Sequence, residues 1–353
     1  MVITQKLETA RRPSWTVDLL DEKNRLIRSL DEVISGSIEL SATTKLGGSG
    51  TLTISGETQI DWLKHRVRIT YNPGIAGVTE WAVATMLVSS PTMKHNEHGR
   101  TYEVALLSTL AAIDEDTTDS TYSLAAGTPI IDTVSKVVRS AGATQIAATP
   151  STATLRSSMM WPAGTSKLKI ANELLDAANY WSLKTDGYGR TIIAPYTKPS
   201  ARTPKYKFQQ GSNAIHSSEW TREQDTSSVP NQCIITTSGD DKTPALVGIA
   251  RNENPNSPYS YQARGRWITM TEEVSEIATQ EAANALAARR LLDRMTPVAK
   301  ISVQHAILPL EPDDAIEFSD SGHNVKATVQ RMSFDLSYDS LCRADWREII
   351  NVG

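Results

Sequence analysis

Two histidines three positions apart are the first residues in this sequence whose spacing could hold a metal ion. His95 and His98 enclose Asn96 and Glu97, and two imidazoles at this interval can bind zinc. A zinc site also needs a third ligand, and none follows nearby before Gly99, a residue typical of a hairpin tip. We therefore interpret the segment as a solvated turn and predict no metal ligands.

Two groups of carboxylates could serve calcium binding or glycoside hydrolysis. The run at 114–119 lacks the central glycine and terminal glutamate of an EF-hand loop, which favours an exposed linker. Asp313, Asp314 and Glu317 could act as a catalytic acid pair, but they lie beside prolines and ahead of a predicted strand. We interpret them as the turn that enters this strand and predict no catalytic residues.

Signatures of nucleophilic and phosphate chemistry are missing from the sequence. The glycine-rich run at 47–50 is not followed by Gly-Lys-Ser/Thr, so we interpret it as a flexible hairpin connection. There is no G-x-S-x-G motif, and neither Cys233 nor Cys342 lies in a catalytic signature. We expect two buried free thiols, whose redox state the sequence leaves open, and we predict a protein that is not an enzyme and has no cofactor.

Length and composition limit the classes of protein further. The 353 residues are enough for two or three domains, and 39% hydrophobic with 22% charged residues is typical of globular proteins. The net charge of -4 is a poor match for a nucleic-acid-binding surface. We find no apolar stretch of about 20 residues and no secretory signal, so we expect no membrane anchor and a protein that begins in the cytoplasm.

The pattern of the first part predicts antiparallel strands. Thr and Ser are abundant and Phe occurs only three times, which favours strands and turns over helix bundles. Short alternating runs separated by turns fill residues 15–55, and the runs at 81–89 and 102–107 flank a polar tip, as in a long hairpin. We assign residues 1–115 to a first β unit.

Helical periodicity begins after the acidic run. Apolar residues at helical spacing predict a helix over 128–142 and a second helix over 166–179, followed by a hairpin over 180–194. Residues 116–200 are therefore expected to form a smaller α+β domain, and three prolines near its end indicate a linker.

Strand patterns resume in the last part of the chain. The runs at 232–237, 245–250, 298–303, 315–318 and 325–336 are typical strands. Thr269 and Glu272 have the spacing of a capping box, which predicts the start of a long Ala-rich helix. We assign 201–268 and 297–353 to a second β unit, and 269–296 to a helical insertion within it.

Several stretches together resemble the tail-tip hub (minor tail) proteins of long-tailed phages that infect actinobacteria, a family similar to the baseplate hub of contractile-tailed phages. The stretches are WTVDLL (15–20), SGS (35–37), GSG (48–50), IDWL (60–63), the segment 161–196 with ELLDAANYWSL (173–183), VPN (229–231), NPNSPY (254–259) and RWI (266–268).

This resemblance implies a fold and an assembly. It implies two related antiparallel β-barrel domains per chain, at 1–115 and at 201–268 with 297–353, and smaller α+β decorating domains. Three chains would form a ring of six barrels beneath the distal tail protein ring. The implied neighbours are tail-tip or central fibre proteins and the tape measure protein, and DNA would pass through the lumen without sequence-specific binding. The implied location is the virion, after assembly in the host cytoplasm.

Two other functions stay open at this stage. A carbohydrate-binding tail protein that contacts the host envelope could use exposed Trp or Tyr rings as stacking platforms. A cell-wall hydrolase, which we rank below it, would need a carboxylate pair that the sequence does not reveal.

Overall fold

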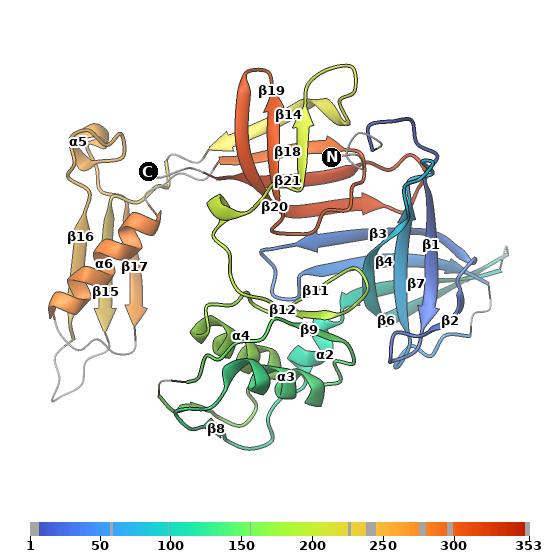
Figure 1. Ribbon diagram of the computed structural model, residues 1–353, viewed down its shortest axis with the longest axis horizontal. Coiled ribbons are helices and arrows are strands. Elements are labelled where there is room, and N and C mark those ends of the chain that lie inside the picture. The colour runs from blue at the N-terminus through green and yellow to red at the C-terminus, as the bar shows by residue number, and fades with distance from the viewer. Residues whose placement is uncertain are drawn as a thin grey trace. The chain divides into compact units, whose positions relative to one another are not determined.

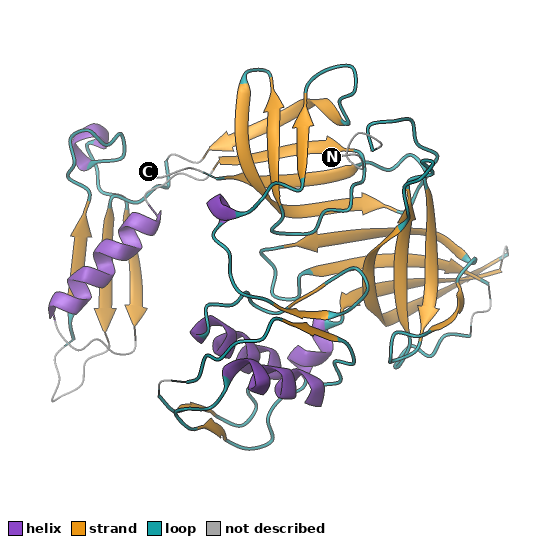
Figure 2. Cartoon of the chain, in the orientation of Figure 1, coloured by secondary structure: helices purple, strands orange, loops and turns teal. Residues whose placement is uncertain are grey.

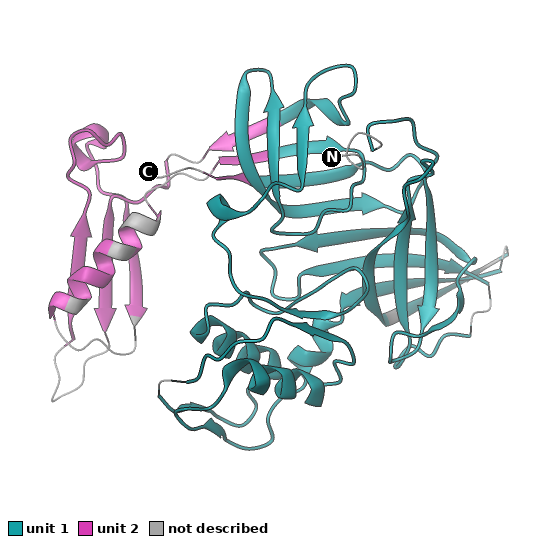
Figure 3. Cartoon of the chain, viewed as in Figure 1, with its two compact units in different colours: residues 1–220, 302–346 teal, residues 221–301, 347–353 magenta. Residues whose placement is uncertain are grey.

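A computed structural model describes residues 7–56, 59–97, 99–155, 157–224, 227–237, 245–274, 280–294 and 299–349 (Figure 1). Strands account for 45% of the residues and helices for 15% (Figure 2), which confirms the expected β-rich α+β class. The chain divides into two compact units (Figure 3). Unit 1 comprises Met1–Trp220 and Ser302–Trp346, and unit 2 comprises Thr221–Ile301 and Arg347–Gly353.

One large sheet of 13 strands dominates the chain. Its first seven strands are, in spatial order, β2 (Leu26–Ser29), β1 (Ser14–Leu20), β5 (Arg66–Asn72), β6 (Trp81–Asn96), β7 (Gly99–Ser108), β4 (Gly48–Ser55) and β3 (Val33–Ser41). The path continues through β20 (His323–Asp335), β21 (Cys342–Glu348), β18 (Ala299–His305) and β14 (His216–Gln224). β19 (Ala315–Asp320) pairs with β20, and β13 (Tyr206–Gln209) pairs with β19.

The long strand β20 joins two halves of this sheet. Its first part pairs with β19, whereas its last five residues, from Arg331 to Asp335, pair with β3. The path from β2 to β14 is open, and none of the sheets formed by the described residues closes into a barrel. β13 lies parallel to β19, a departure from the antiparallel pairing expected throughout.

Alternating burial explains most strands of the first half. In β5, Val67, Ile69 and Tyr71 point into the core, and the residues between them are partly exposed. The prediction that the glycines at 47–50 form a flexible connection was wrong, because β4 begins at Gly48 and pairs with both β3 and β7. A Cβ atom on Gly50 would lie 2.5 Å from the Ser37 carbonyl oxygen, so the close packing of these strands requires glycine.

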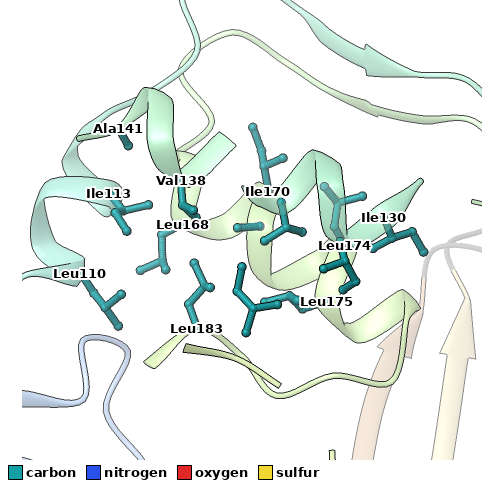
Figure 4. Close-up of a cluster of buried hydrophobic side chains, with 14 of the residues drawn as sticks. Leu110, Ile113, Ile130, Val138, Ala141, Leu168, Ile170, Leu174, Leu175 and Leu183 are labelled. Atoms are coloured by element: carbon teal, nitrogen blue, oxygen red, sulfur yellow. The ribbon is translucent and has the colours of Figure 1, made fainter. Parts of the chain in front are cut away.

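A small α+β region follows β7. Its elements are α2 (Leu110–Glu115), β8 (Tyr122–Leu124), α3 (Ile130–Ser140), β9 (Ile146–Ala148), β10 (Met159–Trp161), α4 (Lys167–Ala177), β11 (Lys184–Thr185) and β12 (Thr191–Ile193), and the short helix η1 (Pro199–Ala201) comes after them. The two predicted helices are confirmed as α3 and α4. Figure 4 shows their apolar faces, with Val138, Leu168 and Leu174 in one shared core.

The acidic run at 114–119 overlaps the end of α2 and is only in part the exposed linker that was predicted, because Glu115 and Asp119 are exposed but Asp114 and Asp116 are partly buried. Its first residues end α2, and the Asp114 carboxylate accepts a hydrogen bond from Ser166 (2.8 Å) and lies 2.6 Å from the Lys45 ammonium. Asp116 pairs with Lys167 at 2.6 Å. Asp114 and Asp116 therefore fix the end of α2 to the start of α4, because each has a cation or hydroxyl donor that only the fold brings near.

Unit 2 contains a three-stranded sheet and a helix. The sheet order is β16 (Val247–Arg251), β15 (Gln232–Thr237) and β17 (Thr269–Val274), with α6 (Gln280–Arg294) packed on one face and α5 (Tyr261–Arg264) in a loop. The predicted helix start at Thr269 was wrong, because this residue begins β17, which runs parallel to β15. Non-local strand pairing outweighs a local capping pattern here.

Among the described helices, none is long and apolar enough to cross a membrane.

Candidate assembly surfaces

The large sheet ends in short or polar strands that could pair with another chain. Along the described path β2 is one end, and two of its apolar side chains, Leu26 and Ile27, are 64% and 48% exposed. β14 is the other end, with a largely polar and exposed sequence. End strands present backbone donors and acceptors on one side, and exposed apolar residues add a favourable contact area.

A second set of exposed apolar side chains lies in a hairpin turn. The turn between β20 and β21 exposes Tyr338 (78%) and Leu341. The Trp15 indole N–H donates to the Ser337 carbonyl oxygen at 3.0 Å, so this turn is anchored to β1 at its base. An anchored turn with an exposed aromatic tip is a suitable contact for a partner.

The segment before β1 connects the two halves of the sheet. The Arg11 guanidinium donates to the carbonyl oxygens of Ile307 (2.5 Å) and Leu7 (2.8 Å). The next residue, Arg12, donates its backbone N–H to the Pro73 carbonyl oxygen at the end of β5 (3.2 Å). We call residues 7–13 the N-terminal strap, because its contacts hold the two halves together.

A buried aromatic cluster fills the second half of the sheet. Phe208 contacts both Trp346 and His305, with ring centroids 4.7 and 4.9 Å away, and the Trp346 and His305 rings stack on each other at 5.6 Å. His216 lies 2.9 Å from the Asp320 carboxylate, and its ring contacts Phe318. Burial raises the pKa of Asp320, but hydrogen bonds from His216 and from a neighbouring serine hydroxyl outweigh this effect and hold the pKa below its ordinary value.

His305 is the group in this cluster whose protonation is most strongly opposed by burial. Burial lowers the pKa of His305 to about 4, and the charges of Arg11 and His216 act in the same direction against a backbone hydrogen bond to Ala306. Its Nε2 atom has no hydrogen-bond partner among the described residues. The ring is therefore neutral at pH 7 and belongs to the core.

The groups considered for chemistry in the sequence lie apart from one another. His95 is exposed in β6, and His98 lies outside the described residues. Asp313 and Asp314 form the predicted turn into β19, where Asp314 accepts a hydrogen bond from the Glu311 N–H at 2.7 Å. The prediction was wrong for Glu317, which lies within β19 and pairs with β13 and β20. Within the described ranges, no group of three or more His, Cys, Asp or Glu side chains is placed to hold a metal ion. Cys233 and Cys342 are buried free thiols, as predicted.

Three strands of the second half of the sheet were missed in the sequence. β13 alternates between buried aromatic and exposed polar residues, but over only four residues, and β14 is mainly polar, so its alternation is weak. β21 has a clear signal, since Cys342, Ala344 and Trp346 alternate with charged residues. This alternation could have identified β21 as a strand.

Comparisons with known proteins show which solved structures share this fold. No family model matches the chain, and no curated protein sequence does either. The tail protein from Neisseria meningitidis MC58 superposes with a TM-score of 0.66 at 11% identity, covering 95% of this chain and 97% of that chain. The 43 kDa tail protein of prophage MuSo2 from Shewanella oneidensis gives 0.64 at 12% identity, with 94% and 98% covered.

A chain of the half-lidded PdpA–VgrG complex from Francisella shares the fold as well. Its TM-score is 0.61 at 8% identity, and the match covers 96% of this chain and 58% of that chain. At these identities the comparisons establish a common fold. The fold defined by the large sheet and its α+β region is thus one that solved tail proteins also have.

Proposed function

We propose that this chain is a structural, non-enzymatic component of a phage-type tail or baseplate. The observation that carries this proposal is a fold shared over nearly the full length of two solved tail proteins, at 97% and 98% of their chains. A match of this extent includes both halves of the large sheet and the α+β region, so it is not the likeness of one common module.

The finer proposal is a trimeric hub. In it, the two halves of the large sheet, which lie within the predicted β units at 1–115 and at 201–268 with 297–353, are two related barrel-like modules. The α+β domain at 116–200 is a decorating domain, and so is unit 2, in which β15, β16 and β17 join the helix of the predicted insertion at 269–296. The division of the large sheet into two halves about β20 supports this arrangement. Three chains would then present six comparable modules, which suits an adaptor between a six-fold tube and a three-fold tip.

The partners in this proposal follow from such a position. The ring would dock on the distal tail protein ring, and tail-tip or fibre proteins and the tape measure protein would contact its other surfaces. Three chains carry 3 × (-4) = -12 charges, and an acidic lumen would let DNA slide without sticking. The protein would be located in the virion tail, after assembly in the host cytoplasm.

Immunogold labelling of purified particles tests the proposed role. Antibodies raised against the purified chain should label the distal end of the tail in electron micrographs. Labelling of the capsid, or particles that lack the chain, would contradict a tail or baseplate function.

A further inference from the structure

Unit 1 contains a cavity that the proposed tail function does not use. Its volume is about 360 Å³, within the range of small-molecule sites. The walls are the turn between β3 and β4, the strand β6, the segment 181–187 and the turn 311–313. Val83, Met86 and Leu183 are among the apolar lining residues.

Most charged side chains that line this cavity already have ionic partners. They are Lys45 with Asp114 at 2.6 Å, Asp186 with Arg190 at 2.6 Å, and Asp313 with Arg202 at 3.8 Å.

Lys184 and Glu311 are the two remaining charged residues of the lining. Neither side chain makes a hydrogen bond or an ion pair with any residue in the part of the chain that the structure describes, and so they do not pair with each other. The Lys184 ammonium lies 5.5 Å from the Trp181 ring centroid. Burial raises the pKa of Glu311, and the charges of Lys205 and then Lys184 oppose this shift. Lys184 also opposes the rise that burial causes in the pKa of Asp313, so its charge acts on both carboxylates of this cavity wall.

We propose that this cavity binds a small zwitterion of the size of an α-amino acid, with its ammonium on Glu311 and its carboxylate on Lys184. Two opposite charges that make no direct ion pair in one half-buried cavity are complementary to a ligand that carries both charges. The apolar wall residues would contact the side chain of such a ligand. This proposal is independent of the tail function, since it depends only on the lining of unit 1.

Titration calorimetry with the full-length protein tests the proposal. The probes are a panel of free amino acids, with L-leucine as reference, and two analogues of leucine: isoamylamine, which lacks the carboxylate, and isocaproic acid, which lacks the amine. We expect at least one amino acid to bind with a Kd below about 1 mM, and each singly charged analogue to bind at least about tenfold more weakly. Absence of binding by every amino acid at about 10 mM, or equal affinity for the analogues, would overturn the proposal.

Charge variants locate the binding within the cavity. Lys184→Gln and Glu311→Gln should each weaken the binding at least about tenfold, whereas Lys207→Gln, which removes a lysine from β13 outside the cavity lining, should leave it unchanged. The double variant Lys184→Glu with Glu311→Lys keeps both charges in exchanged places and should recover part of the affinity. Unchanged affinity in both single variants would overturn the assignment, and the thermal melt of each variant verifies folding.

Discussion

At the scale of single residues, the buried imidazole of His305 couples the fold to pH. The side chain is 1% exposed, and its pKa of about 4 lies below the unfolded value of 6.5. Between these values the unfolded chain binds a proton that the folded chain does not. The stability that the neutral ring contributes is therefore complete above pH 6.5 and is lost as the pH falls toward 4.

A substitution of His305 should reduce this loss. The wild type should lose up to roughly 3 kcal/mol of unfolding free energy through this group between pH 7 and pH 4. His305→Gln removes the titration and should give a flatter pH profile in urea unfolding, although its stability at pH 7 is lower. An identical pH slope in both proteins would contradict the assignment of a neutral buried ring.

At the scale of elements, the turn between β11 and β12 docks on β6. The Thr85 hydroxyl donates to the Gly187 carbonyl oxygen at 2.9 Å, and a Cβ atom on Gly187 would lie 2.0 Å from the Ala82 carbonyl oxygen. Gly187→Ala should therefore lower the unfolding free energy by about 1–3 kcal/mol through overpacking. Thr85→Val removes this hydrogen bond and the longer one that the hydroxyl accepts from Arg68 Nε (3.3 Å), and it should cost about 1–2 kcal/mol. Equal stability of the glycine variant and the wild type in urea unfolding would show that the turn is not docked in this way.

The N-terminal strap allows a matched comparison of two arginines. Arg11→Met removes the hydrogen bonds to Ile307 and Leu7 and should lower the unfolding free energy by roughly 1–3 kcal/mol. Arg12→Met changes an exposed side chain and keeps the backbone contact to Pro73, so it should be nearly neutral. Thermal melts of the two variants compare them directly, and equal effects would argue against the strap.

At the scale of the whole molecule, local periodicity could be predicted from the sequence, but non-local pairing could not. The spacing of apolar residues identified α3 and α4, and alternation identified most strands. β14 was missed because its residues are mainly polar, and Thr269 was assigned to a helix because a capping pattern says nothing about a distant partner strand. The candidate surfaces and the cavity could not be predicted either, because they combine segments that lie far apart in the chain and local patterns do not show which segments meet.

The end strand β2 offers a test of assembly at this scale. Ile27→Lys places a charge on an exposed position of the strand and should weaken self-association with little effect on folding. Leu63→Lys is the matched control, because Leu63 is 95% exposed in a turn and not on a strand. Mass photometry over a range of concentrations compares the two. A loss of assembly in both variants, or in neither, would exclude β2 as a specific contact.

Cryo-electron microscopy of the tail tip in intact particles tests the central claim most directly. The account predicts a closed ring of three copies, with two β modules from each copy arranged around one axis and a continuous channel through the centre. A ring of six whole chains, or a copy bound singly at the side of the tail, would contradict it.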